Sequence, residues 1–341
     1  MIESPDWSVR EGSVVTDSID ESGSPLVSVV IPAFNAQCTL DETLLSVRRQ
    51  TYPNLEILVV DDGSTDGTHL LVLDHIRDDR RVSLLRQKNA GVAAARNRGW
   101  QAARSDLIAF VDADDLWAPN KIEKQVSMLL SAGERMGLVY TWWVGIDQRS
   151  RIRYSVDGSA TEGDVLGQIL LGNFIGHGSS PLIRRQALIA AGGFDSGLHH
   201  AGVHGCEDLL LYYRIAMRYR FGLIPEYLTG YRVVSGRMSS DRMRMLRSFQ
   251  LVAAEMKKDH PEYDGAIDIG IRRYAVFLIG DAAASLDFRQ TWSILSFWRK
   301  NHPLDLLLIP IEVFWSKILW RLRWVKRAIQ RGSQNHRSVF P

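Results

Sequence analysis

Apolar runs alternate with amphipathic stretches along residues 25–135. Four runs are rich in Val, Ile, Leu and Phe with little polar alternation, which is typical of strands buried on both faces of a parallel sheet. The stretches that follow them carry apolar residues at helical spacing. The pattern predicts strands at 26–35, 55–64, 82–87 and 106–115, and helices at 39–50, 64–78, 91–103 and 119–133.

This strict alternation of strand and helix predicts an α/β fold with a Rossmann-like, doubly wound, mostly parallel sheet. Right-handed crossovers bring the carboxyl ends of such strands to one edge, where ligands bind. Three of the four strands end in distinctive motifs: PAFN at 32–35, DDGS at 61–64 and DADD at 112–115. We therefore expect these three motifs to line one crevice.

The pattern changes after residue 135. Strand-like segments are expected at 136–147 and 222–234, and a helix with an acidic first turn at 206–221; from about residue 241 the spacing is helical. The polar N-terminal segment lacks an apolar run and predicts disorder. We divide the chain into a lead at 1–24, a first half at 25–135, a second half at 136–235 and a helical extension at 236–341.

Composition narrows the class of protein. The chain has 341 residues, of which 45% are hydrophobic and 23% charged, as in ordinary globular proteins. Its net charge of +2 gives no indication of a nucleic-acid partner. Two cysteines, Cys38 and Cys206, cannot build a disulfide framework, which fits a cytoplasmic location. No run of apolar residues is long enough to predict a membrane-spanning helix.

Basic charge is concentrated near the C-terminus. Between 311 and 331 there are six Lys or Arg residues and one Glu, a local charge of +5. Apolar residues recur there at spacings of three and four, with Trp interleaved, which predicts a basic amphipathic helix. Such a helix is typical of contact with a membrane surface, and packing on the catalytic domain or on another subunit is the alternative.

The DADD motif places Asp112, Asp114 and Asp115 within four residues after a buried strand. A cap or turn explains one of these acids but not three. Mg²⁺ and Mn²⁺ prefer oxygen ligands and often bind one or two carboxylates together with substrate phosphates. The motif therefore predicts a metal-bridged phosphate ligand, with Asp115 also a candidate to start the next helix.

A second pair, Asp61 and Asp62, ends the neighbouring strand before Gly63. One of these carboxylates can accept a hydrogen bond from a base or a ribose hydroxyl, and an Asx-turn is the alternative. No glycine-rich dinucleotide fingerprint and no P-loop follow the strands, which argues against a dinucleotide oxidoreductase and a P-loop NTPase.

In an ordered set of motifs, the chain resembles the family 2 glycosyltransferases, which have a GT-A fold. The motifs are VSVVIPAFN, LEILVVDDGSTDGT, NAGVAAARNRGW, DLIAFVDADDLWAPNKIEKQV, SSPLIRRQALIAAGGFD and EDLLLYYRIA, within residues 25–235. The resemblance implies metal-dependent, inverting transfer of a sugar from a nucleotide-sugar donor to a hydroxyl of a glycan or lipid-linked acceptor. It also implies a role in cell-surface polysaccharide synthesis, with 25–135 binding the donor and 136–235 the acceptor.

The resemblance also implies roles for residues at matching positions. Asp112 and Asp114 would form the D-x-D pair, with Asp114 in direct contact with Mn²⁺ or Mg²⁺ and Asp112 on the donor side. Asp62 would read the base. The residues expected around the nucleotide, its ribose and its diphosphate are Pro32, Ala33, Asn35, Asp62, Arg96 and Asn97.

A second acidic pair, Glu207 and Asp208, begins a helix. Acids there complement the helix dipole, which is a sufficient structural reason for them. The matching Asp of the family acts as the general base, so Asp208 is expected to take the proton of the acceptor hydroxyl, with Glu207 beside it. The loop upstream contains His199, His200 and His204, and we expect an acceptor loop there rather than a metal site.

One departure from the family pattern concerns the metal. Related enzymes often carry a His shortly after the Tyr-Arg pair that here is Tyr231-Arg232, and this chain has none. Arg232 and Arg237 are candidates to supply positive charge in its place. The departure keeps two alternatives open: a non-catalytic nucleotide-sugar-binding or regulatory protein, and a nucleotidyltransferase.

Overall fold

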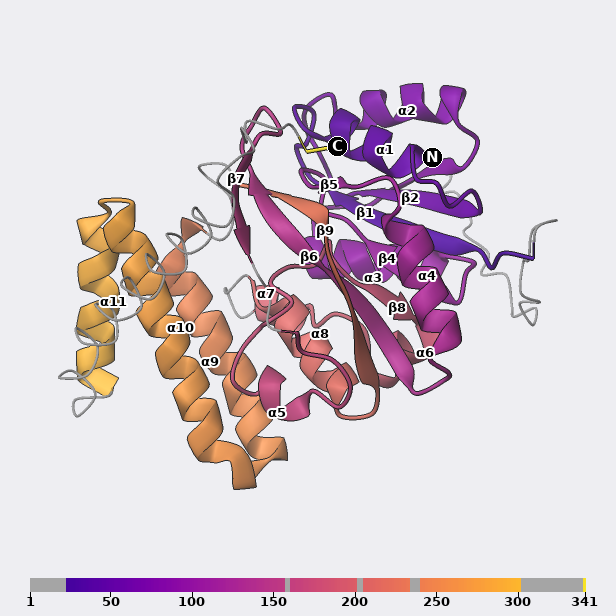
Figure 1. The fold of residues 1–341 in the computed structure, drawn as a ribbon. Helices are drawn as coiled ribbons and strands as arrows, with labels where there is room; N and C mark the ends of the chain where they lie inside the picture. The colour runs from indigo at the N-terminus through magenta and orange to yellow at the C-terminus, as the bar shows by residue number, and fades with distance from the viewer. Residues whose placement is uncertain (1–22, 157–159, 201–204, 234–239, 302–339) are drawn as a thin grey trace, which may run out of the picture.

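A computed structural model describes residues 23–156, 160–200, 205–233, 240–301 and 340–341 (Figure 1). Its centre is a nine-stranded sheet in the order β3-β2-β1-β4-β8-β6-β9-β5, with β7 paired to β6. The strands are β1 (Val27–Ala33), β2 (Leu55–Asp61), β3 (Val82–Arg86), β4 (Leu107–Phe110), β5 (Leu116–Trp117), β6 (Met136–Ile146), β7 (Ile152–Val156), β8 (Leu182–Arg184) and β9 (Arg220–Arg232).

The first four strands are parallel, as the alternation of strand and helix predicts. β1 pairs with β2 and β4, and β2 also pairs with β3. The register places Ala33 opposite Asp61 and Val30 opposite Phe110, so the three strands end at one edge. The convergence expected for PAFN, DDGS and DADD is therefore confirmed.

The second half of the sheet is mixed. β8 lies antiparallel to both β4 and β6, whereas β9 runs parallel to β6. The expected strands at 136–147 and 222–234 are confirmed as β6 and β9. The two-residue strand β5 follows DADD directly and pairs with β9, which the sequence did not indicate.

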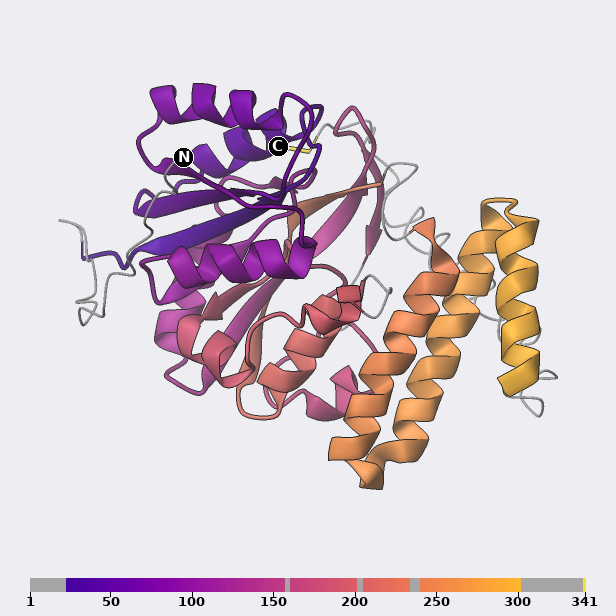
Figure 2. The ribbon, with the colours of Figure 1, turned by 180° about the vertical axis from the view of Figure 1, so that it is seen from behind.

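Two layers of helices cover the sheet because alternate side chains of its strands face opposite sides (Figures 1 and 2). Val29 and Ile31 pack with α1, α2 and α4, and Val30 packs with α3, α6 and α8. The helices are α1 (Leu40–Arg48), α2 (Thr68–Asp78), α3 (Val92–Ala102), α4 (Lys121–Ser131), α5 (Leu166–Ile169), α6 (Arg185–Ala190), α7 (Gly197–His200) and α8 (Glu207–Ala216).

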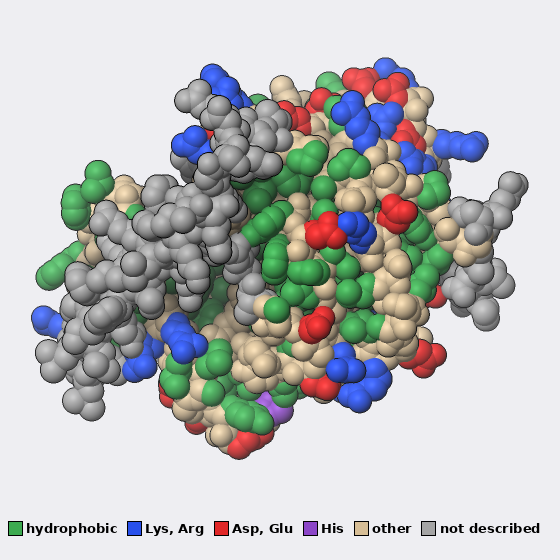
Figure 3. Space-filling view, in the orientation of Figure 1, with side chains coloured by type: hydrophobic (Ala, Val, Ile, Leu, Met, Phe, Trp, Pro, Cys, Tyr) green, Lys and Arg blue, Asp and Glu red, His purple; other side chains and the backbone are tan. Residues whose placement is uncertain are grey.

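The predicted helical extension is present from residue 242. It consists of α9 (Arg242–Asp259), a short 3₁₀ helix (Pro261–Tyr263), α10 (Asp264–Ala284) and α11 (Phe288–Asn301). Leu246 and Phe249 of α9 belong to the same hydrophobic cluster as α8. Leu286, Phe288 and Trp292 remain exposed near the start of α11, at the outer edge where Figure 3 shows hydrophobic side chains.

Within the described residues, no helix combines the length and the hydropathy needed to cross a bilayer. The predicted basic amphipathic helix at 311–331 lies outside the described residues, as does the predicted disordered lead except for Gly23 and Ser24. The expectations for these two segments stay predictions.

Candidate active site

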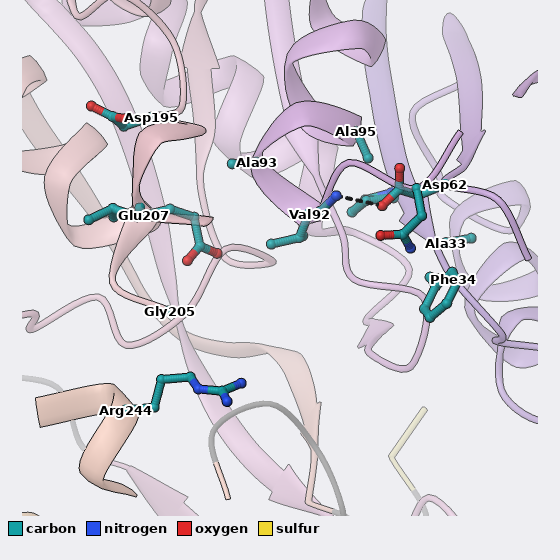
Figure 4. A pocket seen from close by; sticks show the side chains of 14 residues that line it. Ala33, Phe34, Asp62, Val92, Ala93, Ala95, Asp195, Gly205, Glu207 and Arg244 are labelled. Carbon is teal, nitrogen blue, oxygen red and sulfur yellow. Dashed lines mark hydrogen bonds between the residues drawn. The ribbon is translucent and has the colours of Figure 1, made fainter. Parts of the chain in front are cut away.

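A pocket of about 390 Å³ opens at the edge where the parallel strands end (Figure 4). One wall comes from the end of β1, from Asp62 and from the start of α3, and the other comes from the second half and α9. Its lining consists of Pro32, Ala33, Phe34, Asp62, Asn89, Gly91, Val92, Ala93, Ala95, Asp195, Leu198, Gly205, Glu207 and Arg244.

Asp62 holds part of the first wall in place through hydrogen bonds. Its carboxylate accepts hydrogen bonds from the side chain of Gln87 (2.7 Å) and from the backbone N–H groups of Ala90 (2.9 Å) and Gly91 (2.8 Å). The last of these bonds is marked in Figure 4. Asp62 therefore fixes the loop that precedes α3 while lining the pocket, and its contact with a base stays a prediction.

The PAFN motif lines the pocket through different residues from those expected. Pro32 and Ala33 lie in the wall as predicted, and the exposed Phe34 lies there too, which the sequence analysis missed. Asn35 is not among the described lining residues. Its backbone has a φ of +49°, and its side-chain oxygen accepts from the backbone N–H of Thr65 at 2.9 Å.

Arg96 joins two acidic motifs that lie 95 residues apart in the sequence (207 − 112). Its guanidinium, only 3% exposed, donates to Asp112 Oδ1 at 2.6 Å and to Glu207 Oε1 at 2.7 Å. Burial alone would lower the pKa of Arg96, but the two carboxylates outweigh it and hold the pKa above its usual value. The predicted donor-site residues Arg96 and Asp112 are therefore brought together with Glu207.

Asn97, on the next position of α3, is engaged elsewhere. Its amide donates to the carbonyl of Phe194 at 2.7 Å, and its oxygen accepts from the backbone N–H of Phe194 and from the indole of Trp100, both at 2.9 Å. The side chain thus holds the GGFD turn against α3. The contact with the diphosphate or ribose that the resemblance implied for Asn97 stays a prediction.

Asp208 has the electrostatic environment of a general base. Its carboxylate is partly buried and accepts from the backbone N–H of Leu209 at 2.7 Å and from the Asn173 side chain at 3.2 Å. Burial, followed by the neighbouring charge of Glu207, raises the pKa of Asp208 to about 7, although Arg96 opposes the shift. A base with a pKa near neutrality combines a useful ionised fraction with useful proton affinity.

The three acids of DADD have different environments in the structure. Asp112 is paired to Arg96, and Asp114 is half-buried beside it. Asp115 is fully buried; its carboxylate accepts from the Arg232 backbone N–H at 2.9 Å and from the Ser179 hydroxyl at 2.5 Å. The expectation that Asp115 starts the next helix is wrong, because β5 intervenes and α4 begins at Lys121 with Asn120 at its cap.

The segment 173–180 connects the predicted base to the predicted metal motif, and the sequence analysis did not assign it a role. At one end, Asn173 bonds Asp208. At the other, the Ser179 hydroxyl accepts from the backbone N–H of Asp112 at 3.0 Å and donates to Asp115. Polar GHGSS residues between two apolar stretches were the available signal, but only the tertiary contacts show what they bridge.

His177, within the same segment, is buried, with its Nδ1 3.9 Å from the carboxylate of Asp115. Its Nδ1 accepts from the Ser179 backbone N–H at 3.1 Å, and its ring stacks on Tyr231. Burial lowers the pKa of His177 to about 3, so the ring is neutral at physiological pH. Of the upstream histidines, His199 and His200 fall at the end of α7, and His204 lies outside the described residues.

Arg232 was a candidate to supply positive charge in place of the missing His. Its side chain is instead bound within the protein, where it anchors three segments. The side chain is 1% exposed and donates to the carbonyls of Asp114 (2.7 Å) and Asp147 (3.0 Å), and to Glu42 (2.6 Å). Every guanidinium nitrogen is therefore used within the protein. Arg237, the other candidate, lies outside the described residues.

We expect Arg232→Met to lower the free energy of unfolding by about 2–4 kcal/mol, because it leaves buried carbonyl groups without donors. Urea denaturation measures this loss. The control is Arg149→Met, since Arg149 is exposed on the nearby turn and its side chain should contribute little. Equal stability of the two variants would contradict the anchoring role.

The acids of DADD fit a site for a divalent metal ion whose remaining ligands come from the substrate. Burial first, and then the charges of Asp114 and Asp112, raise the pKa of Asp115, which shows that negative charge accumulates here. Among the described residues no group of three or more His, Cys, Asp or Glu side chains forms a ready metal cage. Asp112 and Asp114 nevertheless match the one or two carboxylates that Mg²⁺ or Mn²⁺ uses alongside phosphates and water.

Comparison with known proteins places this site in a family. Residues 28–190 match the family model described as glycosyl transferase family 2. The Escherichia coli UDP-Glc:alpha-D-GlcNAc-diphosphoundecaprenol beta-1,3-glucosyltransferase WfgD is 45% identical over 106 residues, 31% of this chain and 41% of the relative. The putative teichuronic acid biosynthesis glycosyltransferase TuaG of Bacillus subtilis is 38% identical over 107 residues, 31% of this chain and 42% of the relative. The matches thus span less than half of each relative.

Solved structures share the fold over a larger part of the chain. S. aureus TarS 1-349 in complex with UDP-GlcNAc superposes with a TM-score of 0.57 at 16% identity, covering 81% of this chain and 92% of that one. The mannosyltransferase PcManGT from Pyrobaculum calidifontis, in complex with GDP-Man and Mn²⁺, has a TM-score of 0.54 at 21% identity, covering 89% and 90%. The fold and its acidic strand ends thus define a GT-A type α/β protein. Residues 28–190 are those of a glycosyl transferase family 2 domain.

Proposed function

We propose that this protein transfers a sugar from a nucleotide-sugar donor to a hydroxyl of a glycan or lipid-linked acceptor, with inversion at the anomeric carbon. The observation that carries the proposal is the joining of Asp112 to Glu207 through Arg96, beside a pocket large enough for part of a nucleotide. This link brings the D-x-D motif of the first half to the start of α8, where Asp208 has a raised pKa.

Each part of the site then has a chemical task. Pro32, Ala33 and Asp62 hold the nucleoside, and Asp208 accepts the proton of the acceptor hydroxyl. The acceptor oxygen forms a bond to the anomeric carbon as the bond from that carbon to the diphosphate oxygen breaks, and the electron pair leaves with the nucleoside diphosphate. A Mn²⁺ or Mg²⁺ ion held by Asp114 and Asp112 would neutralise charge on that leaving group.

The acceptor is proposed to belong to cell-surface polysaccharide synthesis. Two relatives support this: WfgD is named for a diphosphoundecaprenol-linked GlcNAc, and TuaG is named for teichuronic acid biosynthesis. A lipid-linked acceptor would make contact with the cytoplasmic face of the membrane useful. The basic amphipathic helix predicted at 311–331 would provide that contact.

The donor is identified by thermal stability. Because a ligand that binds the native state raises the melting temperature by mass action, the correct nucleotide sugar with Mn²⁺ should give the largest shift in a panel. We expect a stabilisation of about 3 kcal/mol when the ligand is at ~100 times its dissociation constant. EDTA should reduce the shift.

The chemistry of the products decides among the alternatives. A transferase releases a nucleoside diphosphate when the stabilising donor is supplied with an acceptor. A non-catalytic nucleotide-sugar-binding protein would show the thermal shift but release nothing. A nucleotidyltransferase would instead release pyrophosphate in a separate reaction supplied with a nucleoside triphosphate and a sugar phosphate. Either of these two results would overturn the proposed transfer.

A further inference from the structure

We propose that Arg244, at the start of α9, binds the diphosphate of the nucleoside diphosphate donor, so that the helical extension completes the donor site. This inference rests on the proposed function. It assigns a phosphate-binding residue to a segment, α9, that lies beyond residues 28–190 matched by the family model.

Arg244 reaches the pocket from the side opposite the nucleoside-binding motifs. Figure 4 shows its side chain extending from α9 toward the cavity, with Asp62 and Phe34 across the opening and Glu207 above Arg244 on the same side. The side chain is 45% exposed, and its one ion pair within the described part of the chain is a long contact of 3.5 Å to Asp241 in the same helical turn. The guanidinium is therefore available to a ligand at little desolvation cost.

Arg244 is the cation that the pocket offers to a diphosphate. Three acids line it, Asp62, Asp195 and Glu207, and Arg244 is the single basic residue among the described lining residues. Two of the acids, Asp195 and Glu207, are ion-paired to arginines outside the lining, so Asp62 and Arg244 are the lining charges left for a diphosphate. A guanidinium matches phosphate oxygens in geometry as well as charge.

The three lining acids already have partners within the protein. Asp62 accepts from the loop before α3, Glu207 is paired to Arg96, and Asp195 accepts from Arg214 at 2.9 Å. They therefore do not compete strongly for the Arg244 guanidinium. Arg96, which does not line the pocket, is committed to Asp112 and Glu207, whereas Arg244 has a long ion pair of 3.5 Å to Asp241.

The first turn of α9 is held firmly enough to position Arg244. Arg242 donates to Asp281 of α10 at 2.7 Å, and the Asp241 side chain caps the helix by accepting from the Arg244 backbone N–H at 3.0 Å. Met245 packs against Gly205, where an added Cβ would lie 2.4 Å from its sulfur. Gly205 stands two residues before Glu207, so α9 and the catalytic helix α8 are fixed to each other at this point.

The same position explains how this chain can manage without the His that usually follows the Tyr-Arg pair. The side chains of Arg232 and Arg242 bond to groups within the protein, whereas Arg244 lines the pocket. As the bond to the anomeric carbon breaks, negative charge grows on the departing diphosphate. A cation at Arg244 stabilises that charge and should therefore affect kcat as well as donor binding.

The test compares nucleosides with nucleoside diphosphates. Isothermal titration of uridine, UDP, guanosine and GDP in EDTA, and again with Mn²⁺, gives the contribution of the diphosphate to affinity. We expect Arg244→Ala to weaken binding of the preferred diphosphate about 10- to 100-fold, as loss of a charge-assisted hydrogen bond would, while its nucleoside binds unchanged. Arg244→Lys should recover part of the loss, because the ammonium keeps the charge but not the planar fork.

Arg247→Ala is the matched control, because Arg247 is exposed on the next turn of α9 and does not line the pocket. It should bind both ligands as the wild type does. If Arg244→Ala and Arg247→Ala bind the diphosphate equally well, the Arg244 inference is overturned, although sugar transfer by the wild type would still uphold the proposed function. If the wild type binds neither UDP nor GDP, and no nucleotide sugar in the thermal-shift panel stabilises it, both are overturned.

Discussion

Asp208→Asn lowers the rate of sugar transfer by about 10²- to 10⁴-fold, the range for loss of a general base, with little change in donor affinity. The amide cannot take the acceptor proton, but it preserves the size of the side chain and its bond from the Leu209 N–H. The measurement is kcat with the identified donor and acceptor, together with donor binding by titration. An Asp208→Asn variant that keeps more than a tenth of the wild-type kcat would contradict the assignment.

The pH dependence follows from the raised pKa of Asp208. The base must be ionised, so activity should be lost as the pH falls through about 7 and should be full above it. In a profile of kcat/KM against pH, this rise in activity is the ascending limb, and its midpoint gives the pKa of the base in the free enzyme. Asp208→Asn should remove the limb from whatever activity remains, whereas Asp74→Asn, a change at an exposed acid, should leave it in place.

Measuring stability provides an independent check that Asp208→Asn lowers activity by removing the base and not by unfolding the protein. A carboxyl whose pKa is higher in the folded than in the unfolded state binds more protons when folded, so wild-type stability falls as the pH rises from about 4 to about 7. The asparagine carries no such charge. Above pH about 7, the variant should therefore be at least as stable as the wild type in urea while being nearly inactive.

The sequence predicted the parts of the site that depend on local pattern. Continuous apolar runs identified β1, β2, β3 and β4, and their polar ends then had to meet because parallel strands end together. Asp115 shows the limit of such reasoning. Its partners Ser179 and Arg232 lie 64 and 117 residues away, so nothing in the DADD spacing distinguishes a buried anchor from a helix cap.

Arg96, Arg232 and Arg244 show the same limit for charge. One is a buried bridge, one is a buried anchor and one lines the pocket. These differences arise from packing between distant elements, including α9, whose helical spacing gives no indication that it reaches the first half. Residue type predicted the kind of site, and tertiary contacts decided which arginine performs each task.

Arg96→Met should be the most destabilising of the proposed substitutions. It removes the cation between Asp112 and Glu207, whose side chains are 27% and 11% exposed, and leaves two acids close together. Breaking a buried ion pair from one side typically costs about 3–5 kcal/mol. Urea denaturation should show this loss, whereas Arg104→Met should cost about 1 kcal/mol or less, because the Arg104 side chain is 71% exposed in its pair with Glu56.

A double-mutant cycle with Glu207→Gln separates the bridge from simple loss of packing. If Arg96 chiefly neutralises the acids, Glu207→Gln should lower the free energy of unfolding less in the Arg96→Met background than in the wild type. In that background the Glu207 charge has lost its partner, so its removal also removes a repulsion. Additive losses would contradict the bridge. The cycle should be run above pH about 7, where Asp208, whose pKa is raised to about 7, is ionised in the wild type.

The same substitution should shift the pH profile of any remaining activity. Arg96 holds the pKa of Asp208 down against burial and Glu207, so its removal raises that pKa above about 7 and moves the ascending limb to higher pH. Arg96→Lys keeps a charge that cannot span both acids, and it should place the limb between the wild type and Arg96→Met. A purely structural arginine would lower stability without moving the limb, so the position of the limb tests whether Arg96 couples the metal motif to the base.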